Sequence, residues 1–166
     1  MAHSYASEYP AGIDFDPAYK QFFEDFYATS DTPGAHDKYA DNFTDDATLI
    51  MASKTAKGRD EIIALRHGMW EKVAARTHSP LKIFPAGAAG ADEVMLYGVV
   101  AYTLKTGGQA SVDWAARANL VKGDDGKVRM RYYQVYLVGF PPFPPLCLLE
   151  AVEVRSSCVR EVWCAD

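Results

Sequence analysis

The periodicity of the apolar residues changes once along this chain, near Thr77, and this change limits the folds open to it. Before Thr77 the apolar residues recur at helical spacing; after it they alternate with a period of two over residues 78–85, 93–105, 110–122 and 127–138. The connections contain Pro-Ala-Gly, Thr-Gly-Gly and Gly-Asp-Asp-Gly, which are typical of tight turns between antiparallel neighbours. The pattern predicts an α+β domain in which helices cover one face of a curved antiparallel sheet.

Three helical stretches precede these strands. Asp16 can cap the first and Pro17 can open it, and its aromatic face consists of Tyr19, Phe22, Phe23, Phe26 and Tyr27. Thr32 and Pro33 introduce a second, shorter helix, whose apolar face consists of His36, Tyr39, Ala40 and Phe43. A brief apolar run at residues 48–52 predicts a first strand. A third helix is predicted over residues 59–76, with an apolar face of Ile62, Leu65, Met69 and Val73 and with Trp70 at its edge.

Composition and charge exclude several kinds of partner. The 166 residues carry 17 Lys and Arg against 22 Asp and Glu, a net charge of −5, without a basic run that could follow a row of phosphates. Nucleic acid is therefore not expected as a partner. The chain has no stretch that resembles a signal peptide or a membrane span, so we expect no membrane partner and a cytoplasmic location.

The chain divides into three parts by its sequence. We expect a flexible lead-in over residues 1–15, one domain over residues 16–138 and a tail over residues 139–166. The tail begins with a Pro-rich run and holds all three cysteines, Cys147, Cys158 and Cys164, whose spacing matches no zinc pattern. It could pack locally or close a site on the domain. Because nucleotide-binding glycine motifs and metal-binding histidine spacings are also missing, we expect no cofactor and no metal.

Four segments resemble the SnoaL-like proteins of the nuclear transport factor 2-like superfamily: residues 22–27, 39–47, 112–118 and 131–136. The resemblance implies a cone, formed by a curved sheet around three N-terminal helices, with a pocket open at one end. It also implies cofactor-independent chemistry such as dehydration, cyclisation or isomerisation, although proteins of this kind include some that only bind. The tail after Val138 is unlike the usual end of such proteins.

The run from Ser111 to Lys122 has a polar face and an apolar face. The polar face carries Ser111, Asp113, Ala115, Arg117 and Asn119, and the apolar face carries Val112, Trp114, Ala116, Ala118 and Leu120. An ordinary half-exposed sheet would place the polar face in water. The resemblance to the scytalone dehydratase branch implies instead that it faces the cone. On that reading Asp113 is a candidate catalytic acid or base, and Arg117 either pairs with it or binds an oxyanion.

His78 is the third candidate catalytic residue. It matches in position a catalytic histidine of the dehydratase branch, although Gly98 stands where that branch has a second one. The alternative is a structural histidine where the third helix meets the first long strand. Six residues are candidates for substrate binding, each of which could also serve packing alone: Tyr27, Trp70, Tyr102, Tyr132, Gln134 and Tyr136.

The residues and the resemblance together predict a cofactor-independent acid–base enzyme, an isomerase, cyclase or dehydratase, acting on a polycyclic or polyketide-like small molecule. The alternative is a module of the same fold that binds a small ligand or mediates assembly without catalysis. We also expect a homodimer, because the opposite sheet face would expose large apolar side chains, namely Trp114, Tyr97, Tyr133 and Leu137.

Overall fold

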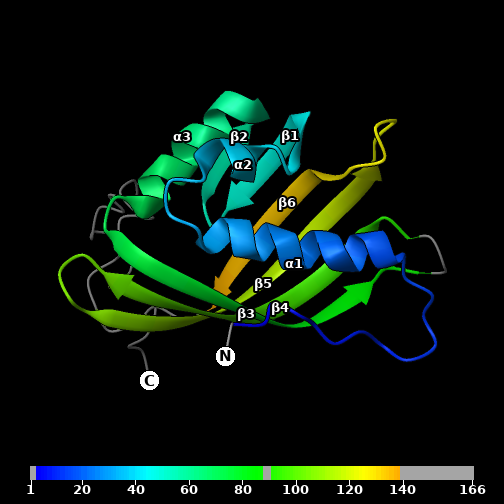
Figure 1. Cartoon of the computed structure of the whole chain (residues 1–166), viewed down its shortest axis with the longest axis horizontal. Coiled ribbons are helices and arrows are strands. Elements are labelled where there is room, and N and C mark those ends of the chain that lie inside the picture. The colour runs from blue at the N-terminus through cyan, green and yellow to red at the C-terminus, as the bar shows by residue number, and fades with distance from the viewer. Residues whose placement is uncertain (1–2, 88–90, 139–166) are drawn as a thin grey trace, which may run out of the picture.

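The computed structural model describes residues 3–87 and 91–138, which form three helices and six strands (Figure 1). The helices are α1 (Pro17–Asp31), α2 (His36–Ala40) and α3 (Gly58–Trp70). The strands are β1 (Phe43–Met51), β2 (Lys54–Lys57), β3 (Val73–Pro85), β4 (Glu93–Leu104), β5 (Gln109–Lys122) and β6 (Val128–Val138). No helix in the described ranges has the length and apolar character needed to cross a bilayer.

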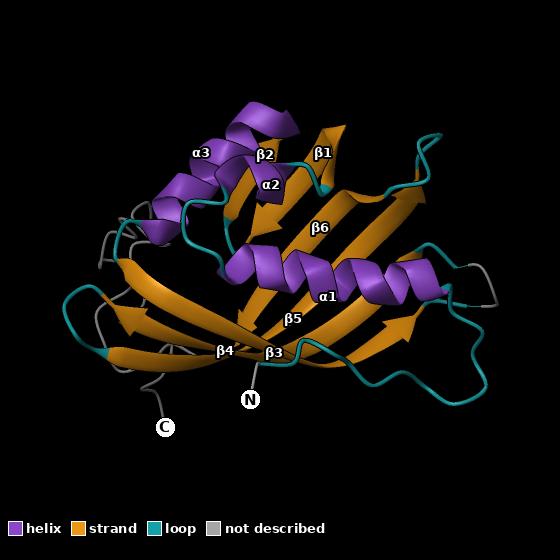
Figure 2. Ribbon diagram, in the orientation of Figure 1, coloured by secondary structure: helices purple, strands orange, loops and turns teal. Residues whose placement is uncertain are grey.

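The six strands form one open sheet in the order β2-β1-β6-β5-β4-β3. The long strands β3 to β6 pair as an antiparallel meander, which confirms the predicted α+β fold. The sheet curves around α1, while α2 and α3 lie over its β1 and β2 end (Figure 2). The sheet is mixed, because β1 pairs with β6 in parallel, and β2 was not predicted. Strand β2 has only four residues, too few for a clear alternation, and nothing local in β1 specifies a distant partner.

Local signals place most element ends correctly. The carboxylate of Asp16 accepts a hydrogen bond from the backbone N–H of Ala18 at 2.8 Å, so α1 begins as predicted. The third helix ends at Trp70 rather than at residue 76, because the chain from Val73 onward pairs with β4. Phe43 likewise begins β1 instead of ending α2. In both places pairing in the sheet overrides a helical spacing of apolar residues.

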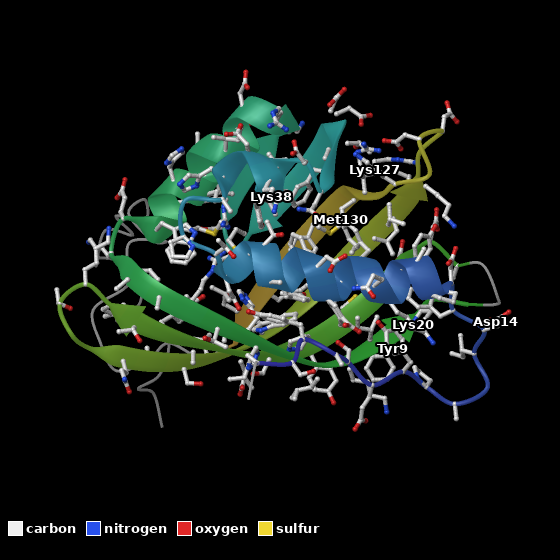
Figure 3. All side chains as sticks on the ribbon, in the orientation of Figure 1. Tyr9, Asp14, Lys20, Lys38, Lys127 and Met130 are labelled. Carbon is white, nitrogen blue, oxygen red and sulfur yellow. The ribbon has the colours of Figure 1, made fainter. Side chains whose placement is uncertain are left out.

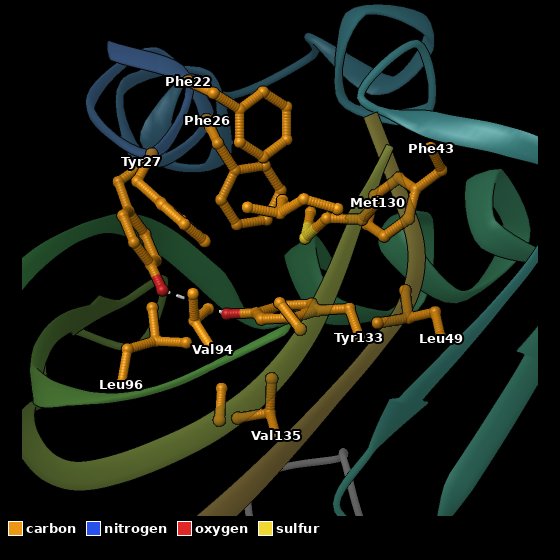
Figure 4. Close-up of a cluster of buried hydrophobic side chains, with 14 of the residues drawn as sticks. Phe22, Phe26, Tyr27, Phe43, Leu49, Val94, Leu96, Met130, Tyr133 and Val135 are labelled. Atoms are coloured by element: carbon orange, nitrogen blue, oxygen red, sulfur yellow. Dashed lines mark hydrogen bonds between the residues drawn. The ribbon is translucent and has the colours of Figure 1, made fainter. Parts of the chain in front are cut away.

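An aromatic cluster fixes α1 against the sheet (Figure 4). The ring of Phe26 contacts Tyr39 and Tyr133, each at 5.4 Å between centroids, and Phe43 at 6.1 Å. All four side chains are buried. The contacts with Phe43 and Tyr133 are edge to face, whereas the Tyr39 ring is tilted at 34°, and such contacts add to the effect of burial. The C-terminal half of α1 is thereby held at a defined position above the concave face of the sheet.

Residues 3–15, expected to be a flexible lead-in, lie along the domain (Figure 1). The backbone N–H of Glu8 donates to the carbonyl of Leu81 at 2.9 Å, and that of Ile83 donates to the carbonyl of Glu8 at 3.0 Å. Phe15 is buried, and Tyr5 and Tyr9 pack against the core. The segment therefore adds a short bridge to the outer edge of β3. The predicted tail over residues 139–166, with the three cysteines, lies outside the described residues.

Candidate active site

The structure places the two faces of β5 opposite to our expectation. Trp114 and Ala116 are buried on the concave face, while Asp113 is exposed on the outer face. Arg117 also lies outside, where its guanidinium donates to Glu93 at 2.9 Å across the β4–β5 pair and so lowers the pKa of Glu93. The predicted placement of Asp113 and Arg117 in the cone is wrong, because the concave face packs against the aromatic side of α1 and takes the apolar residues.

The same inversion applies to β6. Tyr133 and Val135 face the concave side, whereas Tyr132, Gln134 and Tyr136 lie on the outer face, where the Tyr132 hydroxyl donates to Gln134 Oε1 at 2.6 Å. These three residues do not line the cavity. Trp70 is buried and does not line the cavity either. Its ring lies 4.8 Å from the guanidinium of Arg76 and 5.7 Å from that of Arg66.

A small cavity of about 40 Å³ lies between α1 and the concave face. Three of the predicted site residues, Tyr27, His78 and Tyr102, line it. Its other polar walls come from Ser30, Arg76, Trp114 and Tyr133. Because one water needs roughly 10–15 Å³, the cavity has room for a few waters or a few non-hydrogen atoms of a ligand.

His78 is held on this wall by Asp31, the last residue of α1. The His78 Nδ1 lies 2.5 Å from Asp31 Oδ1, and the His78 backbone N–H donates to Asp31 Oδ2 at 2.6 Å. The Asp31 side chain is 6% exposed and the His78 side chain 14%. Because a carboxylate only accepts, Nδ1 carries the proton in this arrangement, and Nε2 has the free lone pair of a neutral imidazole.

Two buried arginines fix the end of α1 that carries Asp31. Arg66 donates to the carbonyls of Thr29, Ser30 and Thr32, and Arg76 donates to the carbonyl and hydroxyl oxygens of Ser30. These bonds satisfy carbonyls that a helix end leaves unpaired, and both cations complement the negative end of the helix dipole. Burial lowers the pKa of Arg66 to about 10. Arg76 Nε also lies 3.5 Å from Asp31 Oδ1.

Burial is the largest influence on the pKa of His78, and it lowers that pKa below 6.5. The hydrogen bond and charge of Asp31 oppose this shift, whereas the charges of Arg76 and Arg66 add to it. The imidazole is therefore neutral at pH 7. A neutral imidazole beside a carboxylate can accept a proton on Nε2 and share the resulting charge with the carboxylate.

Two phenols form a further polar wall. The hydroxyl oxygens of Tyr27 and Tyr133 lie 3.1 Å apart, as the dashed line in Figure 4 shows. Burial raises the pKa of both phenols, so both keep their protons at neutral pH. Only one of the two protons can lie in the bond between them. The other can donate to a ligand oxygen.

Trp114 completes the wall, and Gly98 makes room for it. The Trp114 ring lies 5.4 Å from that of Tyr27 and 5.9 Å from that of His78, and its Nε1 is buried without a hydrogen-bond partner among the described residues. A Cβ on Gly98 would clash with the backbone carbonyl oxygen of Ser79 and would come within 2.8 Å of Trp114 Cζ2 and 2.9 Å of Pro80 Cα. Gly98 thus fits this position because any larger side chain would collide both with the backbone of β3 and with the indole.

Sequence reasoning missed Asp31, Arg76, Trp114 and Tyr133 as site residues. Asp31 looks like the polar end of a helix, and Arg76 fell inside the predicted third helix. Trp114 and Tyr133 were assigned to the outer face. The apolar neighbours of Trp114 along β5 were the signal that could have placed it in the cone.

No protein-family model matches the chain, and no curated protein matches it. Solved structures do. A candidate scytalone dehydratase from Novosphingobium aromaticivorans superposes with a TM-score of 0.67 at 15% identity, over 77% of this chain and 87% of that one. ActVI-ORFA from Streptomyces coelicolor superposes with a TM-score of 0.60 at 19% identity, over 72% of this chain and 94% of that one. Nuclear transport factor 2 from Cryptosporidium parvum superposes with a TM-score of 0.59 at 14% identity, over 76% of this chain and 100% of that one. At these identities the likeness concerns the fold, and the chain has the nuclear transport factor 2-like fold.

Proposed function

We propose that this protein is a cofactor-independent acid–base enzyme, an isomerase, cyclase or dehydratase, in which Asp31 and His78 transfer the proton. The observation that carries the proposal is the 2.5 Å contact between Asp31 Oδ1 and His78 Nδ1 at the wall of a cavity. Solved structures of the same fold include a candidate dehydratase, which supports this class of chemistry without fixing the reaction. Asp113 and Arg117 have no part in the proposed reaction, because both lie on the outer face of the sheet.

The proposed reaction begins at a carbon next to a carbonyl group. Nε2 of His78 accepts a proton from that carbon, the C–H electron pair moves into the new carbon–carbon double bond, and the carbonyl oxygen becomes an enolate oxygen. Asp31 stabilises the imidazolium through Nδ1–H. Return of the proton to another carbon completes an isomerisation. If a hydroxyl group leaves from the β-carbon instead, it takes the proton and departs as water.

The donors for the enolate oxygen come from other residues that line the same cavity. The free proton of the Tyr27–Tyr133 pair and the Nε1–H of Trp114 are the groups that fit this role. Fixed donors in an apolar site stabilise developing negative charge because they need no reorganisation. The substrate is therefore proposed to carry at least one carbonyl oxygen next to the reacting carbon.

The volume of the cavity limits how much of the substrate enters it. Pockets for drug-sized ligands measure roughly 300–1,000 Å³, against about 40 Å³ here. The proposed substrate is a polycyclic or polyketide-like molecule. Only its reacting carbonyl and the neighbouring carbons fit inside the cavity unless the walls move. The same small volume favours the second candidate function, a module that binds a small ligand without turning it over.

Proton exchange on simple ketones distinguishes these two functions. A panel of small cyclic ketones is incubated in D2O, and loss of the α-proton signal is followed by NMR. We expect catalysed exchange with the natural chain and with Asp113→Asn, and a loss of about 10²- to 10⁴-fold with His78→Gln. Binding of a ketone with no exchange above the buffer rate would support the binding module instead.

We also propose that the protein forms a homodimer through the outer face of the sheet. The residues that support it differ from those expected, since Trp114, Tyr133 and Leu137 line the cavity and Tyr97 alone of the four is exposed on the outer face. The outer face exposes four large side chains on β3, β4 and β6, each 40–42% exposed: Phe84, Met95, Tyr97 and Tyr136. The rings of Phe84 and Tyr97 stack at 6.1 Å. Contiguous apolar surface of this kind is typical of interfaces.

A further inference from the structure

Two buried guanidinium groups meet at the end of α1. The carbonyl oxygen of Ser30 accepts a hydrogen bond from Arg66 Nη1 at 3.2 Å and another from Arg76 Nε at 3.1 Å. Both guanidinium groups also lie against the Trp70 ring, at 5.7 Å and 4.8 Å from its centroid. The side chains of both arginines are buried. Two positive charges are therefore held close together inside the domain.

One buried carboxylate faces these two cations. Arg76 Nε lies 3.5 Å from Asp31 Oδ1, and the Asp31 side chain is 6% exposed. The carbonyl oxygens that accept hydrogen bonds from the arginines carry no net charge, and His78 is neutral at pH 7 because burial lowers its pKa. Lys38 and Lys127, which Figure 3 labels, are exposed by contrast, so water and salt screen them. The end of α1 thus carries a surplus positive charge, and a buried charge without a partner is costly.

The surplus charge lies beside the cavity. Arg76 and Ser30 both line it. Nε and Nη2 of Arg76 donate to Ser30, whereas its Nη1 takes no part in these bonds. The Ser30 hydroxyl oxygen accepts from Arg76 Nη2 at 2.8 Å, which leaves the hydroxyl proton for another acceptor. This wall therefore offers a ligand both hydrogen-bond donors and a positive charge.

Trp114 adds a group that can only donate. It lines the cavity, and its Nε1 is buried without a hydrogen-bond partner among residues 3–87 and 91–138. The Tyr27–Tyr133 pair offers one further proton, because only one of its two phenols donates within the pair. A ligand group with a negative charge and several acceptor lone pairs would match these donors.

The size of the cavity selects among such groups. Its volume of about 40 Å³ holds roughly three non-hydrogen atoms, if one water needs 10–15 Å³. A carboxylate group has three non-hydrogen atoms in one plane, two of them oxygens that accept hydrogen bonds. Much of the remaining lining is apolar, for example Val100 and Val135. The outer oxygens of a larger inorganic anion such as phosphate would lose water there without gaining partners.

We propose that the cavity binds the carboxylate group of an organic acid, held by Arg76, by the Ser30 hydroxyl and by Trp114 Nε1, beside the Asp31–His78 pair. The inference goes beyond the proposed function and holds whether or not the bound acid is then converted. If the enzyme proposal is correct, small carboxylates compete with the ketones for the cavity. Two consequences, a preference for charged ligands and a change in the basicity of His78, are measurable without turnover.

A bound carboxylate raises the pKa of His78. A negative charge beside the ring favours the imidazolium, which is opposite to the effects of burial and of the two arginine charges. By linkage, the protonated ring strengthens binding of the anion by the same factor. The charged and titratable groups that face His78 are Asp31 and Tyr27 on α1, Arg66 on α3, Arg76 on β3 and, at the backbone carbonyl of His78, His3.

The first experiment titrates the natural full chain with acetate and with acetamide, which has the same shape without the charge, and follows the indole and imidazole signals by NMR. Sodium chloride keeps the ionic strength equal in the two titrations. We expect acetate to bind with a dissociation constant of about 1 to 10 mM. It should shift the Trp114 indole N–H signal and raise the pKa of His78 by about one unit.

The Trp70 indole is the internal control for this titration. Its Nε1 is also buried without a partner among the described residues, but Trp70 does not line the cavity, so its signal should not move. The same response to acetamide as to acetate would overturn the proposal. An absence of any response at Trp114 and His78 would overturn it as well.

The second experiment compares two tryptophan substitutions by the same acetate titration, with His78 as the reporter. Trp114→Phe keeps an aromatic ring and removes the Nε1–H, and we expect acetate to bind about tenfold more weakly, since a hydrogen bond to a charged group is lost. Trp70→Phe is the matched control, because it removes a buried Nε1–H outside the cavity and should leave the affinity unchanged. Equal affinities in the two variants would overturn the proposed role of Trp114 in binding the anion.

The two proposals fail in different ways. If acetate binds as expected but no ketone is exchanged, the carboxylate site stands and the enzyme proposal fails. If exchange depends on His78 while acetate and acetamide behave alike, the enzyme proposal stands and the carboxylate site fails. Because the first experiment uses the natural chain, it decides the matter even if Trp114→Phe does not fold.

Discussion

Asp31 binds His78 with both of its carboxylate oxygens, one on the ring nitrogen Nδ1 at 2.5 Å and the other on the backbone N–H at 2.6 Å. The pair joins the end of α1 to β3, across 47 residues of sequence. One side chain thus fixes the position of the strand, the orientation of the imidazole and the tautomer that leaves Nε2 free. The consequences for stability, packing and chemistry can be tested separately.

Replacement of Asp31 by Asn is expected to destabilise the fold. The amide cannot compensate the charge of Arg76, which is buried 3.5 Å away, and breaking a buried ion pair costs about 3 kcal/mol. Chemical denaturation measures the change in the free energy of unfolding. Asp37→Asn is the control, because Asp37 pairs with Arg59 while its side chain is 84% exposed, and we expect a loss below about 1 kcal/mol. Equal losses in the two variants would contradict the structural role of Asp31.

Gly98→Ala is expected to shift both Trp114 and the neighbouring backbone of β3. The added Cβ would clash with the carbonyl oxygen of Ser79 and would meet Trp114 Cζ2 at 2.8 Å and the backbone of Pro80 at 2.9 Å, an overpacking that costs at least about 1–3 kcal/mol. The variant should unfold at lower denaturant and show altered indole fluorescence. Gly68→Ala is the matched control, since its Cβ would meet nothing within 4 Å and alanine favours the helix by about 1 kcal/mol. A Gly98→Ala protein as stable as Gly68→Ala would show that neither the indole nor the backbone of β3 confines this position.

The outer face of the sheet is expected to hold two copies together. Tyr97→Asp places a charge among the exposed apolar side chains of that face and should convert a dimer to a monomer, as measured by light scattering after size exclusion. Thr103→Asp introduces the same charge at an exposed position near the other end of β4 and should leave the dimer intact. A natural chain that elutes as a monomer at micromolar concentration would contradict the interface.

Removal of residues 139–166 is expected to leave a folded domain. The six strands and three helices lie within the described ranges before that point, and the aromatic cluster around Phe26 joins α1 to β6. Thermal unfolding of the shortened chain should stay cooperative. Insoluble or non-cooperative protein would show instead that the tail contributes to the core.

Much of the fold could be predicted because its signals are local. Asp16 and Pro17 mark the start of α1, and strands β4 to β6 begin and end within one residue of the alternating runs. The face that lines the cone could not be predicted from alternation, which defines two faces without saying which one a helix covers. The apolar residues that alternate with Trp114 along β5 indicate the correct inner face, whereas the resemblance that placed Asp113 inside indicated the wrong one.

The site could be predicted only in part for a related reason. His78, Tyr27 and Tyr102 line the cavity, as predicted. Tyr27 lies on the aromatic face of the first helix, whereas His78 was selected through the resemblance to the dehydratase branch. Asp31 and His78 are 47 residues apart in the sequence, and Tyr27 and Tyr133 are 106 residues apart. Contacts of that kind depend on tertiary packing, which no local pattern reports.

The most direct test of the central claim is the NMR titration of the His78 ring nitrogens in the natural chain and in Asp31→Asn. We expect the pKa of His78 to lie below 6.5 in the natural chain, and the neutral ring to carry its proton on Nδ1. In Asp31→Asn the pKa should fall further, because the carboxylate that opposes the effect of burial is gone. A neutral form protonated on Nε2, or a pKa unaffected by the substitution, would contradict the account.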